Sequence, residues 1–359
     1  MKCNNCGGTM RYDVASYGLV CDFCGSVKPL HRPEEEVVVG EQDFNSVARD
    51  AVTDWGTTRR LVTCKQCGAE MLYDSDQMSA MCPYCGSAII LTAGEMNSGI
   101  APGGIIPFTT TREDVEKNYY KWNKFAFWSP ESFRKGKVLG NLVGVYVPFW
   151  TFTADTFSTY KGNFGYTTEY NTGDGIRRDT KWYNRNGIVD KLINDVCIGG
   201  SRRFISNKKL NQVVNFRTDE ILPYTPDALA GFAAEKYTIG IDEAWEMLKP
   251  TIRKKIEHAA CVNERADCYN DLKISTEYGN IKFRYFLFPI WLAACKYKGK
   301  IYYVVASGHD NRGLCDRPVS AAKIVLIVLA ILAILSIPML FYIVMAIYSF
   351  IIQNSFLLG

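Results

Sequence analysis

The longest apolar stretch of the chain lies near its C-terminal end. Residues 324–352 form a run of 29 residues that is interrupted only by small polar groups, two tyrosines and Pro338. About 20 apolar residues span the roughly 30 Å hydrocarbon layer of a bilayer, and a helix of this run would be about 44 Å long. Buried helices of soluble proteins rarely carry so long a run. The pattern predicts a transmembrane helix over 322–353, kinked at Pro338.

Two arrangements of this tail are compatible with its length. One kinked span is favoured, because a re-entrant hairpin turning at residues 336–338 would have halves of only 12–14 residues. Arg312, Arg317 and Lys323 precede the run, and no charged residue follows it. Positive residues favour the cytoplasmic side, and the chain opens without an apolar signal segment. We therefore expect a single-pass protein of the cell membrane whose N-terminal domains are cytoplasmic.

Residues 101–316 mix the periodicities of helices and strands. The pattern Thr111-x-x-Asp114 is typical of a helix start. Further helices are expected from about Thr225 and Asp242, the second with an apolar stripe at helical spacing. The strand-like segments are 138–205, 283–296 and 300–307. This region is expected to form an α+β cytoplasmic domain.

A short motif occurs twice within this domain. Val147-Pro148-Phe149-Trp150 is matched by Phe288-Pro289-Ile290-Trp291, and a Tyr-Lys-Gly turn follows each copy. Two interpretations are open. Either the domain consists of two similar halves, each a helix followed by strands, or Pro-x-Trp is ordinary packing of edge strands.

Charge is distributed unevenly along the chain. Residues 1–100 have a net charge of −5, and the remainder has +9. The hydrophobic fraction of 48% and the charged fraction of 22% are typical of globular proteins and exclude wholesale disorder. The overall net charge of +4 is too small to indicate a nucleic-acid-binding protein by itself.

Eight of the 13 cysteines form four Cys-x-x-Cys pairs, and the second set repeats the first at an offset of 61 residues. The match extends to CNNCGGTMRYD against CKQCGAEMLYD, and to CDFCGS against CPYCGS. In a cytoplasmic protein such pairs favour metal binding over disulfides. The predicted ligands are Cys3, Cys6, Cys21 and Cys24 in the first set, and Cys64, Cys67, Cys82 and Cys85 in the second.

This spacing predicts two four-cysteine zinc ribbons, at 1–30 and 61–92, joined by a linker over 31–60. Four thiolates leave no open position on the metal, so the two Zn²⁺ ions are expected to be structural. Each ribbon is too small to have its own apolar core, so we expect each one to fold on its own metal.

No motif of a known enzyme class occurs in the chain. It contains no phosphate-binding loop, no HExxH, no GxSxG and no protein-kinase signature, and we therefore expect a non-enzymatic protein. The ribbons lie in the acidic part of the chain, which favours a protein partner over nucleic acid.

The whole layout resembles a bacterial family of membrane-tethered double zinc-ribbon proteins, with ribbons of the transcription factor IIB type. The resemblance is carried by CNNCGG, CPYCGS, GGIIPF at 103–108, GVYVPFW at 144–150, LAGFAAEKY at 229–237 and KISTEYGNIKFRYFLFPIW. It implies a scaffold or recruitment factor that binds protein partners at the cytoplasmic membrane face.

The resemblance also implies two partners, a second membrane protein and a phage-shock type protein. An anionic lipid surface is a further candidate, since basic residues precede the tail. The alternative is a membrane-tethered, nucleic-acid-associated factor of replication or transcription, although the chain has no helicase motif.

Overall fold

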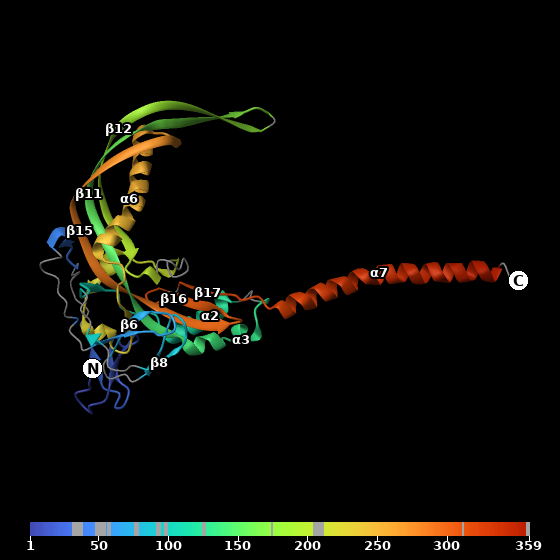
Figure 1. Cartoon of the computed structure of the whole chain (residues 1–359), viewed down its shortest axis with the longest axis horizontal. Helices are drawn as coiled ribbons and strands as arrows, with labels where there is room; N and C mark the ends of the chain where they lie inside the picture. The colour runs from blue at the N-terminus through green and yellow to red at the C-terminus, as the bar shows by residue number, and fades with distance from the viewer. Residues whose placement is uncertain are drawn as a thin grey trace.

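Figure 1 shows the computed structural model of the chain, in which a body of strands and short helices carries a long curved arm and a projecting C-terminal helix. The fold is mixed α+β, as predicted. The structure describes the whole chain except residues 31–38, 47–54, 56–58, 75–78, 91–94, 97–99, 124–126, 174, 204–211, 311 and 357–359. Much of the expected linker 31–60 therefore lies outside the described residues.

The main sheet has 12 strands, and a long antiparallel pair forms its centre. β11 (Val143–Asn171) pairs with β15 (Cys268–Tyr297) from Val143↔Leu292 to Gly165↔Cys268. β12 (Ile176–Gly199) pairs with the other edge of β11. The strand-rich region expected at 138–205 thus consists mainly of two long strands.

The outer parts of β11, β12 and β15 form the arm (Figure 1). Along β11, residues 144–152 are all buried, whereas buried and exposed residues alternate from Ala154 to Gly162. One face of the arm is covered by α6 (Ile241–Glu264), whose buried side chains include the predicted stripe of Trp245, Leu248, Ile252 and Ile256. β15 begins at Cys268 rather than at about Phe283, because its first half pairs with β11 in the arm.

Of the helices predicted to begin at Thr111 and at Thr225, the structure contains only the first. α2 (Arg112–Trp122) begins as predicted, with Thr111 and Asp114 in a reciprocal capping box. The helix expected from Thr225 is wrong, since only a 3₁₀ turn forms there, η4 (Pro226–Leu229). Gly231 then takes a left-handed backbone conformation, φ +85°, which turns the chain into β14 (Ala233–Glu235).

The other elements are short. They are β1 (Met10–Asp13), β2 (Gly18–Cys21), β3 (Val27–Pro29), β4 (Gln42–Asp43), η1 (Phe44–Ser46), β5 (Arg59–Thr63), β6 (Glu70–Asp74), β7 (Ser79–Met81), β8 (Ala88–Ile90), β9 (Glu95–Met96), β10 (Gly104–Ile105), α3 (Glu131–Arg134), η2 (Lys137–Asn141), η3 (Thr218–Glu220), β13 (Leu222–Pro223), β16 (Lys300–Ser307) and β17 (Gly313–Cys315). β1, β2 and β3 form a separate sheet, β7 pairs with β8, and β5, β6 and β9 belong to the main sheet.

The repeated Pro-x-Trp motif marks two similar halves of the domain. Trp150 of β11 donates its indole N–H to the carbonyl of Ile239, 3.1 Å away, and Trp291 of β15 donates to the carbonyl of Thr110, 3.0 Å away. Each of these carbonyls belongs to the residue immediately before the N-cap of a long helix, α6 and α2 respectively. The same side chain therefore performs the same task in both halves.

The surrounding backbone repeats the same bonds. Gly200 N–H donates to the carbonyl of Pro148 at 2.7 Å, and Gly308 N–H donates to the carbonyl of Pro289 at 2.9 Å. The carbonyls of the two glycines each accept two N–H groups from the segment before the helix: Thr238 and Ile239 in one half, Thr109 and Thr110 in the other. Edge-strand packing alone does not explain this agreement.

The two halves are interlocked. In sequence order the first half contains β10, α2, β11 and β12, and the second contains β14, α6, β15 and β16. The tryptophan of each half holds the helix of the other half. β10 likewise pairs in parallel with β15, and β14 with β11. Removal of either half would therefore take away one pairing partner of the other half's short strand and the tryptophan that binds the segment before its helix.

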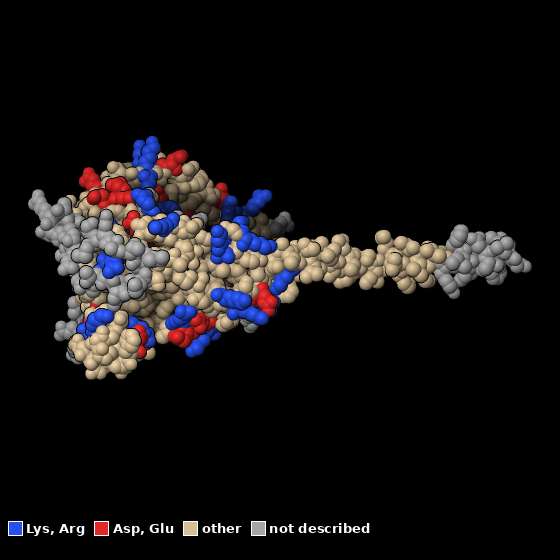
Figure 2. All heavy atoms as spheres, turned by 60° about the horizontal axis from the view of Figure 1, so that its bottom comes forward, with Lys and Arg blue, Asp and Glu red and all other residues tan. Residues whose placement is uncertain are grey.

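α7 (Ala321–Phe356) is one continuous helix that leaves the body and contains Pro338 (Figure 1). The re-entrant hairpin considered for the tail is therefore wrong. None of the described side chains from Ala321 to Ile347 is buried, and this stretch is long and apolar enough to cross a membrane. In Figure 2 the part of this helix that is not grey carries no Lys or Arg beyond its base.

Candidate metal centres

The four Cys-x-x-Cys turns have one common backbone geometry. In each turn the N–H of the glycine after the second cysteine donates to the carbonyl of the first cysteine, at 2.7–3.0 Å. These glycines have φ between +70° and +71°, which side chains with a Cβ rarely adopt. They are Gly7, Gly25, Gly68 and Gly86. Each turn therefore presents two sulfurs to the same side.

The turns come together in pairs, as the spacing predicted. In the first tetrad the Sγ atoms of Cys3 and Cys24 are 3.6 Å apart, and those of Cys6 and Cys21 are 3.5 Å apart. In the second tetrad the corresponding distances are 3.7 Å for Cys64–Cys85 and 3.6 Å for Cys67–Cys82. Within each tetrad all four sulfurs lie within 4.8 Å of one another, so each group could hold one metal ion.

The donor set suits a soft, tetrahedrally coordinated cation. Hydrogen bonds from the hydroxyl and the backbone N–H of Ser26 lower the pKa of Cys24 to about 6. Burial raises the pKa of Cys64, but hydrogen bonds from Ser87 and from the backbone amides of its own turn outweigh burial and bring it to about 6. The thiolate, the form that binds metal, is thus favoured near neutral pH at Cys24 and Cys64, whereas the pKa values of Cys6, Cys67 and Cys82 are raised.

The remaining five cysteines lie outside these groups. Among the residues that the structure describes, only the two tetrads bring three or more potential ligand atoms within range of one ion. Burial raises the pKa of Cys197 to about 12, and that of Cys315 also rises. The thiols of Cys197 and Cys315 are therefore in their neutral form at physiological pH.

One relative matches almost the whole length of the chain. The chain is similar to the uncharacterised protein YdjG of Bacillus subtilis strain 168, with 24% identity over 327 residues that cover 90% of this chain and 91% of YdjG. No family model matches the chain, and no solved structure matches it. The similarity to YdjG and the two cysteine tetrads fit a zinc-ribbon-like family.

The second tetrad is built into the body through the main sheet. β6, which follows the Cys64–Cys67 turn, pairs with β14 through Leu72↔Ala234 and Met71↔Glu235. The sequence predicted that each ribbon would fold on its own metal. The structure instead places β5 and β6 of the second ribbon in the same sheet as the middle domain, while β7 and β8 form a separate pair. We therefore infer that the folding of this ribbon is coupled to that domain.

A buried polar group lies against the second tetrad, and sequence reasoning missed it. Glu235 of β14 accepts hydrogen bonds from Tyr84 at 2.5 Å and from Ser201 at 2.6 Å. The guanidinium of Arg203 lies over the Tyr84 ring, 5.2 Å from its centroid, and donates to the carbonyl of Cys67 at 2.5 Å. Burial raises the pKa of Glu235 to about 7. Only the position of Tyr84 inside a Cys-x-x-Cys turn hinted at this group.

The first tetrad lies nearer the surface, with Cys6 and Cys24 exposed. Its ribbon contacts the body through the N–H of Tyr12, which donates to the carbonyl of Ala230 at 2.9 Å, and through an ion pair between Lys28 and Asp227 at 2.9 Å. Tyr12 and Leu19 are also buried in the main core, but the first ribbon shares no sheet pairing with the body, unlike the second ribbon. The two metal centres thus share one geometry but differ in their surroundings.

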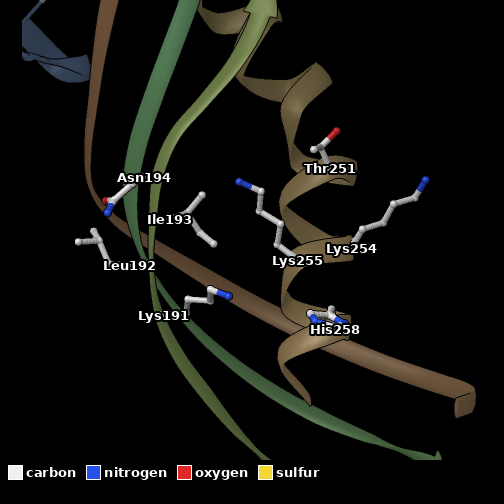
Figure 3. Close-up of a pocket in the computed structure, with 8 residues that line it drawn as sticks. All are labelled: Lys191, Leu192, Ile193, Asn194, Thr251, Lys254, Lys255 and His258. Carbon is white, nitrogen blue, oxygen red and sulfur yellow. The ribbon is translucent and has the colours of Figure 1, made fainter. Parts of the chain in front are cut away.

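The basic residues of α6 line a second candidate site, a hollow of about 530 Å³ between this helix and β12. Figure 3 shows Lys191 of β12 and Lys255 of α6 reaching into the space between strand and helix, whereas Lys254 points away from the strand. His258 also lines the hollow, and none of its described lining residues is acidic. The lining of this hollow is therefore positively charged, although Glu257 and Asp267 line a neighbouring hollow that shares Lys254 and His258.

Proposed function

We propose that this chain is a non-enzymatic, zinc-stabilised scaffold that α7 anchors in the cell membrane and that recruits protein partners to its cytoplasmic face. The observation that carries the proposal is α7 itself. A helix long and apolar enough to cross a bilayer projects from a folded body without burying any described side chain against it. In water this exposed apolar surface would be strongly unfavourable.

Zinc is the metal proposed for both tetrads. Sites with four thiolates in tetrahedral reach select zinc or iron, and paired Cys-x-x-Cys turns are typical of structural zinc ribbons. With all four positions taken by cysteine, no position remains for a substrate or a reactive water. The role proposed for the two ions is therefore to stabilise the fold.

The arm supports a protein partner. On its outer face Phe157 lies opposite Asp190, and Ile188 and Leu192 flank Asp190 two residues away on either side. Phe157, Ile188 and Leu192 are all exposed, and Leu192 points away from α6 in Figure 3. A cluster of exposed apolar side chains on a sheet marks a surface suited to association.

The partners proposed are a second membrane protein and a phage-shock type protein, on the support of the sequence resemblance. Anionic lipid is a further proposed contact. The cytoplasmic orientation is proposed from Arg312, Arg317 and Lys323, which precede the apolar run.

Capture from solubilised membranes tests the proposal. The full chain is expected to retain a specific membrane-associated protein that is lost when Ile188→Asp and Leu192→Asp are combined. Val262→Asp is the matched control, because Val262 is equally exposed but lies on α6. Identical protein sets from all three chains would contradict a recruiting role for the arm.

The hollow beside α6 supports a second candidate function, binding of nucleic acid. Three lysines that each contact a phosphate would give a slope of about −2 for log affinity against log salt with single strands. Salt-dependent binding of random oligonucleotides that disappears on replacing Lys191, Lys254 and Lys255 by alanine would favour this function over protein recruitment.

A further inference from the structure

Two large aromatic rings are exposed side by side at the base of α7. Phe127 and Trp128 lie in the connection between α2 and α3, with 60% and 43% of their surfaces exposed. Their rings meet edge to face, with centroids 5.6 Å apart. Isolated exposed apolar residues are common. A contacting Phe–Trp pair beside a helix of membrane-spanning length indicates instead that another surface covers the two rings.

The pair is fastened to the first turn of α7. Lys323 Nζ donates to the carbonyls of Phe127 at 2.6 Å and Ser129 at 2.9 Å, and it also lies 5.2 Å from the centre of the Phe127 ring. The N–H of Ser320 donates to the carbonyl of Trp128 at 2.8 Å. Figure 1 shows the connection between α2 and α3 reaching the point where α7 leaves the body.

These contacts set the level of the rings relative to a bilayer. The uncharged apolar run begins at Ile324, immediately after Lys323. If α7 spans the membrane, the boundary between head groups and hydrocarbon falls at this junction, because a lysine ammonium stays at the polar side. Groups that contact Lys323 therefore lie at the same boundary, where aromatic side chains are enriched.

We propose that Phe127 and Trp128 form a membrane-docking collar, a second contact through which the body inserts into the head-group region of a phospholipid bilayer. The inference rests on the proposed anchoring by α7. The occupant is lipid because the pair is continuous with the surface by which α7 enters the bilayer. Arg317, which donates to the carbonyl of Trp122, adds a positive charge at the same level.

The collar would restrict the orientation of the body on the membrane. If α7 were the only membrane contact, the body would be free to rotate about residues 317–320, which connect it to the helix. With Phe127 and Trp128 inserted, two separate points contact the membrane, and the body is held in one orientation. In Figure 1 the arm rises from the body and its free end bends toward the side on which α7 leaves, so this orientation also fixes where the arm lies relative to the lipid surface.

Lipid quenching of tryptophan fluorescence tests the collar. The full chain is reconstituted into vesicles of phosphatidylcholine and phosphatidylglycerol, with or without acyl-chain-brominated lipid, as wild type, Trp128→Phe and Trp182→Phe. Trp182 is the matched control, since it is 49% exposed but lies on the arm strand β12. The emission lost in Trp128→Phe is expected to be quenched by brominated lipid and shielded from aqueous acrylamide. The emission lost in Trp182→Phe is expected to show the reverse.

The outcomes separate this inference from the proposed anchoring. A chain that fails to float with the vesicles would overturn both. A chain that floats, while Trp128 is quenched only by acrylamide, would overturn the collar alone. Shielding of Trp128 that requires other membrane proteins would assign the pair to a protein partner and also overturn the lipid contact. Phe127→Asp, which leaves the backbone bonds to Lys323 intact, is expected to abolish the lipid quenching of Trp128.

Discussion

Phe23 and Tyr84 occupy the same position in the two ribbons, inside the second Cys-x-x-Cys turn of each. Phe23 is exposed, whereas Tyr84 is buried and hydrogen-bonded to Glu235. One duplicated turn therefore faces solvent and the other anchors its ribbon to the body. The difference arises from the surroundings, because β14 packs against the second turn and supplies the partner that the buried hydroxyl of Tyr84 needs.

Loss of a single ligand is expected to distinguish the two centres. Both Cys6→Ala and Cys67→Ala should reduce the metal content from two zinc ions per chain to one. Cys67→Ala should lower the midpoint of thermal unfolding of the body more, because β6 belongs to the main sheet. Elemental analysis and tryptophan-monitored unfolding measure the two effects. Equal midpoints for the two variants would show that the second ribbon is energetically independent.

Glu235 is expected to make folding depend on pH. Its pKa rises to about 7 in the folded protein from an ordinary value of 4.5, so the folded state binds this proton more tightly. Its contribution to stability is therefore present below about pH 4.5 and is lost as the pH rises through about 7. The side chain of the Glu235→Gln variant does not ionise. The difference in unfolding free energy between this variant and wild type should therefore shift in favour of the variant by on the order of 1–3 kcal/mol between about pH 5.5 and pH 8. Denaturant titrations of the zinc-loaded chains measure it, and parallel pH profiles would contradict it.

Among the elements, those set by local sequence were predicted best. The cysteine turns, the capping box of α2 and the apolar stripe of α6 each depend on residues a few positions apart. The helix expected at Thr225 failed because Gly231 and the pairing of β14 with β11 and β6 decide the conformation there. The pairing of β6 with β14 joins segments about 160 residues apart, and no periodicity of either strand specifies its partner.

For the metal centres too, the features set by local sequence were predicted and those set by long-range contacts were not. All eight cysteines were assigned from spacing, and the structure brings them together as two tetrads. Glu235, Ser201 and Arg203 were not recognised because each is an isolated polar residue in sequence. The extent of the arm was also missed, since the Tyr-Lys-Gly turn expected at residues 160–162 lies inside the continuous strand β11.

Trp150 and Trp291, which bind the segments before α6 and α2, are expected to contribute equally to the free energy of unfolding. Trp150→Phe and Trp291→Phe each remove an indole N–H from a buried carbonyl and reduce the packed volume, which should cost about 1–3 kcal/mol of unfolding free energy. Trp182→Phe, on the exposed arm, should change it by less than about 0.5 kcal/mol. Chemical denaturation compares the three. A neutral Trp291→Phe alongside a destabilised Trp150→Phe would argue against two similar halves.

At the scale of the whole molecule, the body and α7 are joined by few contacts, which lie at Arg317, Ser320 and Lys323 among the described residues. Truncation after Asp316 is therefore expected to yield a soluble, folded protein, whereas the full chain requires detergent. Detergent phase partitioning measures this, and unchanged unfolding of the fragment serves as the control for folding. A full chain that stays in the aqueous phase would contradict the membrane anchor.

During synthesis on the ribosome, the first half of the middle domain emerges before the elements that complete it. Trp291 is made 181 residues after Thr110, whose carbonyl it binds, so α2 and β10 wait for β15 with their apolar surfaces unpaired. Such long-range closure is slow and leaves a growing chain open to aggregation. The last strands of the body, β15, β16 and β17, also directly precede the apolar run. If α7 enters the bilayer as proposed, completion of the body and delivery to the membrane are therefore close together in time, and a newly made chain reaches the lipid when its core has only just closed.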